Sequence, residues 1–207
     1  MGFVLALVSS AAFGLIPLFS LPLLRSGLSA DCVLFYRFLF AALSLGIILV
    51  LRRERLAAPL HELGKLALFS ILYALAALLM IWGLLYLPGG ATATLQFLYP
   101  LMVMLIMTIF FHEKFSIITA SSVLLAILGV ALLGGGSLDP VGVGLLLASA
   151  LCNALYISGL HVARIHSISG LSITFWVLLF GTGVSLINAL VSGTFEIIGT
   201  REQLVLS

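Results

Sequence analysis

Residues 66–111 read LALFSILYALAALLMIWGLLYLPGGATATLQFLYPLMVMLIMTIFF and contain no Asp, Glu, Lys, Arg or His. The run is interrupted by the turn sequence LPGG at 87–90. A bilayer core of about 30 Å needs about 20 apolar helical residues, because lipid offers no hydrogen-bond partner to a bare backbone amide. The run therefore predicts two membrane-spanning helices, Leu66–Leu87 and Ala91–Phe111.

The rest of the chain continues this pattern. Five more apolar runs have the length of a span: Gly2–Leu24, Cys32–Leu51, Ser116–Leu133, Val141–Ala163 and Gly170–Val191. Of the 207 residues, 63% are hydrophobic and 8% charged, whereas soluble domains carry about 25% charged residues. This composition excludes a soluble globular fold, a disordered chain and a nucleic-acid-binding protein. We predict an all-α polytopic membrane protein with seven transmembrane helices.

Cations in the short loops predict the orientation of the spans. If the N-terminus is cytoplasmic, six cations fall on the cytoplasmic side: Arg52, Arg53, Arg55, Lys65, Lys114 and Arg164. The other side receives Arg25 and Arg201. Cytoplasmic loops carry the excess of Lys and Arg, so we expect a cytoplasmic N-terminus. No Lys or Arg precedes the first apolar run, which argues against a cleaved signal peptide.

An internal repeat is visible at an offset of 140 residues. This offset aligns Gly2–Ile47 with Gly142–Ile187 and gives ten identities. A unit of five spans is odd, so its second copy enters the membrane from the opposite face, as in the inverted repeats of many transporters. We expect a first repeat over residues 1–136 and the start of a second over 137–207. The chain then holds seven helices of an expected ten and lacks the last three.

Several strings carry a family resemblance: FYRFLFA (35–41), GLLYLPGGATATLQFLYPLMVMLI (83–106), FHEKFS (111–116) and LAILGVALLGGG (125–136). In this order and spacing they resemble the first repeat of an EamA-type member of the drug/metabolite transporter superfamily. LASALCNALYISGLHVARIH (147–166) resembles the start of the second repeat. The resemblance implies ten helices, a central cavity between two halves, and transport of small metabolites, often as export. Together with the excess of cations on the cytoplasmic side, the resemblance favours a bacterial inner membrane, with a eukaryotic endomembrane as the alternative.

Arg37 lies five residues into the second span, where an unpaired guanidinium is costly. Gln96 lies equally deep in the fourth span, and Trp82 lies near the outer end of the third. We therefore expect Gln96 to accept a hydrogen bond from Arg37, and Trp82 to act as its cation–π partner. Such an arginine either anchors a substrate carboxylate or phosphate, or ties helices together and snorkels to the interface.

The fourth span contains an interruption at Tyr99 and Pro100. Proline removes the amide that would bond the carbonyl of Gln96, and in a membrane a freed carbonyl must meet a neighbour or a water-lined cavity. The segment is therefore either a wall of the substrate site or a packing kink. Pro17 and Pro22 break the first span in the same manner, and either let it bend in gating or shape its packing.

Two polar residues of the sixth span, Asn153 and Tyr156, lie one turn apart near mid-depth and share a helix face. They either line the cavity or hydrogen-bond between helices. In the fifth span, Ser122, Ala126 and Gly129 place small side chains at helical spacing, which favours close helix packing or a homodimer contact. The expected partners are a small-molecule substrate and the lipid bilayer, without nucleic acid.

No motif predicts a catalytic residue, a metal or a cofactor. Cys32 and Cys152 lie inside apolar runs and outside any paired motif. The leading hypothesis is a secondary-active transporter that exports amino acids, organic anions or related solutes by alternating access. A second is a non-transporting membrane subunit or an inactive fragment that needs a partner. An intramembrane enzyme would need a nucleophile and base, or metal ligands, at one depth, and the sequence shows neither.

Overall fold

The computed structural model describes residues 15–54, 57–112, 139–163, 165 and 168–195, with single positions at 117, 121, 124, 125 and 128. Within these ranges every regular element is an α-helix. The helices are α2 (Ile16–Arg25), α3 (Ala30–Arg52), α4 (Leu60–Tyr86), α5 (Gly89–Gln96), α6 (Tyr99–Phe111), α8 (Pro140–Ala163) and α9 (Gly170–Val191). The all-helical prediction is confirmed for the described residues.

Five stretches of the described chain are long and apolar enough to cross a membrane: Ala30–Arg52, Leu60–Tyr86, Gly89–Phe111, Pro140–Ala163 and Gly170–Val191. They correspond to the second, third, fourth, sixth and seventh predicted spans. Of the first span only the end is described, as α2. The fifth span lies outside the described residues except at isolated positions, and Ser122, Ala126 and Gly129 are among those not described.

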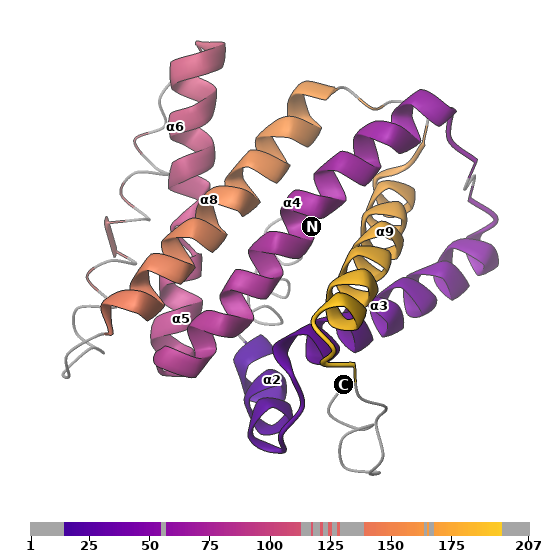
Figure 1. The fold of residues 1–207 in the computed structure, drawn as a ribbon. Coiled ribbons are helices and arrows are strands. Elements are labelled where there is room, and N and C mark those ends of the chain that lie inside the picture. Colours follow the sequence, from indigo (N-terminus) through magenta and orange to yellow (C-terminus); the bar gives the residue numbers. More distant parts are fainter. Residues whose placement is uncertain are drawn as a thin grey trace.

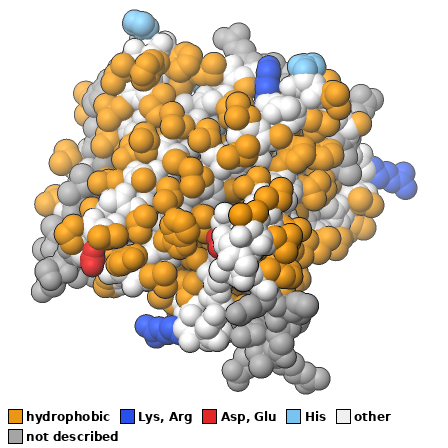
Figure 2. Space-filling view, in the orientation of Figure 1, with side chains coloured by type: hydrophobic (Ala, Val, Ile, Leu, Met, Phe, Trp, Pro, Cys, Tyr) orange, Lys and Arg blue, Asp and Glu red, His pale blue; other side chains and the backbone are white. Residues whose placement is uncertain are grey.

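The surface agrees with a membrane environment. Hydrophobic side chains cover most of the face seen in Figure 2, and the basic and histidine side chains lie at its edges. Many large apolar residues are exposed, among them Leu51, Leu85 and Phe110. In water such a surface would aggregate, whereas lipid tails solvate it.

The third span begins earlier than predicted. Its helix starts at Leu60, directly after Pro59, and not at Leu66. The charge of Lys65 marks the edge of the apolar run, but a helix ends where its backbone hydrogen bonds end. The first turns of α4 therefore carry the polar residues His61, Glu62 and Lys65.

The proline predictions have different outcomes in the two spans. The break in the fourth span is confirmed, because α5 ends at Gln96 and α6 begins at Tyr99, next to Pro100. Helix α2 continues through Pro22 to Arg25, so the helix does not end at this proline, and the predicted kink at Pro22 stays a prediction. Pro17 occupies the first turn of α2, where a helix tolerates a missing amide.

The long helix α4 runs diagonally through the molecule, with α8 along one side and α9 along the other (Figure 1). Glycines permit the close approach of α4 and α8. A Cβ added at Gly142 would lie 2.8 Å from the Cβ of Tyr86, and one at Gly83 would lie 2.9 Å from the Leu146 side chain. At the far end, Gly159 faces the ring of Phe69 at still closer range. These contacts fix the register of the antiparallel pair.

Helices α3 and α9 form a second close pair. Both begin after a serine that caps the helix, and in each case the hydroxyl accepts a hydrogen bond from the amide three residues on. Ser29 accepts from Cys32 and Ser169 from Ser172, each at 3.3 Å. The pair is also tied at one end, where the Asn188 amide donates to Asp31 at 2.7 Å. The start of α3 therefore lies beside the end of α9, so the helices are antiparallel.

Candidate functional site

A small cavity lies where α2, α3, α4, α5 and α8 meet. Four polar side chains line it, from four different helices: Arg37, Tyr73, Gln96 and Asn153. The remaining walls are apolar and include Phe38. The cavity volume is about 40 Å³, which is close to the share of a single water molecule in the liquid, about 30 Å³. Three of the residues predicted from the sequence thus share one site.

The guanidinium of Arg37 has a neutral partner. Its Nη1 donates to the hydroxyl of Ser20 on α2, at 3.4 Å. A guanidinium has five N–H donors, and within the described ranges no carboxylate pairs with Arg37. The arginine is therefore a half-buried cation that keeps unused donors beside the cavity. Ser20, itself buried, was not predicted.

Gln96 is held by another residue than the sequence analysis expected. Its side chain is 2% exposed, and its Oε1 lies 2.9 Å from the hydroxyl of Ser149 on α8. The same hydroxyl lies 2.6 Å from the carbonyl oxygen of Ala76 on α4, and its single proton serves one acceptor at a time. Gln96 shares the cavity with Arg37, but its hydrogen bond is to Ser149.

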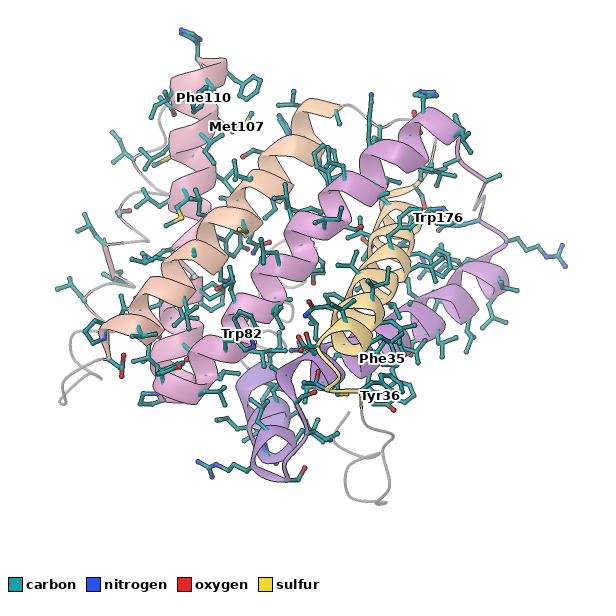
Figure 3. All side chains as sticks on the ribbon, viewed as in Figure 1. Phe35, Tyr36, Trp82, Met107, Phe110 and Trp176 are labelled. Atoms are coloured by element: carbon teal, nitrogen blue, oxygen red, sulfur yellow. The ribbon has the colours of Figure 1, made fainter. Side chains whose placement is uncertain are left out.

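Trp82 and Tyr99 lie away from this cavity. Trp82 is 38% exposed near the end of α4 (Figure 3) and is not among the cavity residues. Tyr99 is the first residue of α6 and is half-buried outside the cavity. The expected contact between Arg37 and Trp82 is replaced by the proximity of Arg37 to Tyr73.

The reason is geometric. Arg37 is seven residues from the start of α3 and Tyr73 is thirteen from the end of α4, or about 10 Å and 20 Å along the helices at 1.5 Å per residue. The sequence-based estimate counts residues inward from each loop, and it assumes that neighbouring helices end at the same depth and run parallel. Helices α3 and α4 do not, so residues at equal distances from their loops do not lie at equal depth.

Tyr73 is the main site residue that the sequence analysis missed. Its ring stacks on Phe38 of α3 with centroids 5.4 Å apart, and it contacts Tyr156 of α8 at 5.1 Å. A signal for it exists in the sequence. Tyr73, Ala77 and Met80 recur at helical spacing and all three line the cavity. Tyr156 thus does not line the cavity but packs against Tyr73, which does. Asn153, one turn away on the same helix, lines the cavity directly.

Comparison with protein families identifies the kind of protein. The model of the EamA-like transporter family matches residues 1–135. The chain belongs to the EamA-like transporter family. This family lies within the drug/metabolite transporter superfamily and is not an enzyme family. No curated protein matches the chain.

Family membership and the apolar helices together make this EamA-like chain an integral membrane protein of a transporter family. The matched range includes Arg37, Tyr73 and Gln96, whereas Asn153 and Ser149 come from the chain beyond it. In this EamA-like transporter the cavity is therefore completed by α8. Among its described residues, no group of three or more His, Cys, Asp or Glu side chains is placed to hold a metal ion.

Proposed function

We propose that this chain is a secondary-active transporter that exports small metabolites bearing a carboxylate or phosphate group, such as amino acids and organic anions. The observation that carries the proposal is the half-buried Arg37, whose partner in the described chain is the neutral hydroxyl of Ser20. A cation that is partly withdrawn from water is stabilised by a negative partner. The planar guanidinium fork matches a carboxylate or a phosphate, so an anionic substrate supplies the missing charge.

The other polar groups of the cavity orient the substrate. Asn153 and Tyr73 line the cavity with Arg37, and both side chains can donate and accept hydrogen bonds. Gln96, already bonded to Ser149, keeps its remaining amide capacity for the substrate. A substrate with an anionic head and a second polar group fits this set better than a purely apolar solute.

The transport cycle in this proposal is alternating access between two inverted repeats, residues 1–136 and 137–207, with seven spans in the chain. Two observations support a pseudo-two-fold relation. Helices α3 and α9 start 140 residues apart, each behind a capping serine. They also form an antiparallel pair, because the start of α3 lies beside the end of α9. A two-fold axis in the membrane plane relates equivalent helices in this antiparallel way.

Substrate entry requires a conformational change. The cavity of about 40 Å³ is far below the 300–1,000 Å³ of typical small-molecule sites, so it must widen before a metabolite fits. The break at residues 97–98 separates α5 from α6. Motion of α5 about this break changes the position of Gln96 and opens one wall, while α6 stays packed on α8.

The orientation in this proposal has the N-terminus in the cytoplasm of a bacterium, with the spans in its inner membrane. Arg52, Arg53 and Lys65 lie at one end of the helices, around the connection from α3 to α4, and Arg25 lies at the other. The first end then faces the cytoplasm, because cytoplasmic loops carry more Lys and Arg.

Transport assays in proteoliposomes test the proposal. Labelled amino acids and organic acids are screened for uptake and efflux with the parent chain, Arg37→Gln, Arg37→Lys and the matched control Arg25→Gln. We expect Arg37→Gln to lower kcat/KM about 100-fold, since two charge-assisted hydrogen bonds are lost, and Arg37→Lys to retain part of the activity. Arg25→Gln should transport like the parent.

Two results would overturn the proposal. One is parental transport of anionic solutes by a folded Arg37→Gln protein. The other is the absence of movement of any anionic or zwitterionic solute by the parent chain under imposed ion gradients. Preferential movement toward the periplasmic face supports export, and exclusive accumulation in the opposite direction contradicts that part of the proposal.

A further inference from the structure

A second cavity lies between α3, α4 and α9, and its lining residues do not overlap with those of the Arg37 cavity. Its volume is about 170 Å³. Three polar side chains line it: Asp31 at the start of α3, and Ser185 and Asn188 near the end of α9. The other walls are aliphatic. The cavity therefore combines one polar end with an apolar body.

Asp31 is a buried carboxylate with neutral partners. Its side chain is 8% exposed. Oδ1 accepts from the Asn188 amide at 2.7 Å, and Oδ2 accepts from the Thr194 hydroxyl at 3.2 Å. A carboxylate has about four lone-pair sites, so two hydrogen bonds leave acceptor capacity. Burial of an anion is costly unless a positive charge compensates it, and neither of these two partners supplies one.

Ser185 gives an independent indication of a ligand. Its side chain is 3% exposed, and its hydroxyl has no hydrogen-bond partner in the described structure. Buried polar groups are almost always hydrogen-bonded. This hydroxyl lines the same cavity as Asp31. A group with a positive charge and several N–H donors satisfies both residues, and a primary ammonium has three donors.

The apolar body of the cavity extends to the lipid-facing surface. Leu34 and Leu78 form buried walls, whereas Ile71 and Leu75 of α4 are about half exposed. If each heavy atom needs about the 30 Å³ of a water molecule, the cavity holds about six atoms. We propose that it binds a primary alkylammonium group, with the nitrogen at Asp31 and Ser185 and the aliphatic chain along Leu75 and Ile71.

Two sources share this chemistry: the headgroup of an aminophospholipid and a free alkylamine. The intact 207-residue chain is titrated in micelles with n-hexylammonium, and with n-hexanol and n-hexanoate as controls. Native mass spectrometry compares retention of phosphatidylethanolamine with that of phosphatidylglycerol. The variants are Asp31→Asn, Ser185→Ala and Leu75→Trp, whose ring fills the cavity from the lipid side. Ser158→Ala is the matched control, because Ser158 is also a buried serine without a described partner, but lies outside this cavity.

We expect n-hexylammonium to bind at least tenfold more tightly than n-hexanol or n-hexanoate. Asp31→Asn and Leu75→Trp should each weaken this binding at least tenfold, Ser185→Ala about threefold, and Ser158→Ala not at all. Selective retention of phosphatidylethanolamine that the same variants abolish identifies the lipid as the source, and binding of the free amine alone identifies a soluble amine.

The proposal is overturned if n-hexylammonium and n-hexanol bind equally and no lipid preference exists. It is also overturned if folded Ser185→Ala and Leu75→Trp proteins bind n-hexylammonium as tightly as the parent chain. These two variants keep the test decisive if Asp31→Asn does not fold.

Discussion

Ser149 of α8 is hydrogen-bonded to Gln96 of α5, with 2.9 Å between Oγ and Oε1. The two residues are 53 positions apart in the chain, and the second lies directly before the break in the fourth span. The orientation of the Gln96 amide is therefore set from α8, and Arg37 does not set it. Any movement of α8 relative to α4 also moves a polar wall of the cavity, since Ser149 contacts the Ala76 carbonyl as well.

Ser149→Ala removes this connection. We expect a loss of about 1 kcal/mol in the free energy of unfolding, the usual size of a hydrogen bond between membrane helices. The measurement is unfolding by SDS titration in mixed micelles. Ser158→Ala on the same helix is the control, because its hydroxyl has no described partner, and it should change stability little. Equal losses in the two variants would show that the Ser149 hydrogen bonds contribute nothing.

Gly159→Val tests the close contact of α4 and α8. The Phe69 ring occupies the space that a side chain at position 159 requires, so the ring or the helix must shift. Overpacking of this kind costs about 1–3 kcal/mol, which SDS titration resolves. Gly144→Val provides the comparison on the same helix, because a Cβ there has no neighbour within 4 Å. A Gly159→Val protein as stable as the Gly144→Val protein contradicts the packing.

A double-mutant cycle at Asp31 and Asn188 tests the tie between the start of α3 and the end of α9. Each single change to Ala leaves a polar partner without its hydrogen bond, at a cost of about 1–3 kcal/mol. In the double variant both side chains are removed, so neither is left without the hydrogen bond that the other supplied. We therefore expect its loss of stability to be smaller than the sum of the single losses. Strict additivity would mean that the 2.7 Å contact has no energetic effect.

Tyr73→Phe tests the part of Tyr73 in substrate binding. The change keeps the ring that stacks on Phe38 and contacts Tyr156 and removes the hydroxyl alone. We expect KM for an anionic substrate to rise about tenfold, the effect of about 1.4 kcal/mol, with unfolding stability unchanged. Tyr86→Phe is the control, since Tyr86 is exposed at the end of α4. An unchanged KM in Tyr73→Phe would show that the Tyr73 hydroxyl does not bind the substrate.

Much of the fold could be predicted from the sequence. The uncharged run 66–111 predicts two spans and the turn between them, and the structure has a helix ending at Tyr86 and another starting at Gly89. The seventh span, Gly170–Val191, has the predicted bounds. The start of α4 was not predicted, because hydropathy locates the membrane and does not locate the last backbone hydrogen bond of a helix.

Only part of the candidate site could be predicted from the sequence. Burial of polar groups in an apolar run is visible in the sequence, and this signal found Arg37, Gln96 and Asn153, which line one cavity. The partners of these residues were not found. Ser20, Ser149 and Tyr73 are common residue types, and they become partners through the way in which five helices pack.

The amino-acid sequence by itself determined that this chain is an all-helical membrane protein, where most of its spans lie, and that a proline interrupts the fourth. These properties depend on local quantities, namely the length of an apolar run and the missing amide of Pro100. Only the tertiary structure decided that Tyr73 and not Trp82 lies beside Arg37, that Ser149 holds Gln96, and that Asp31 and Ser185 share a second cavity. Such contacts depend on the tilt and register of packed helices, which here follow from glycine contacts distant in the chain.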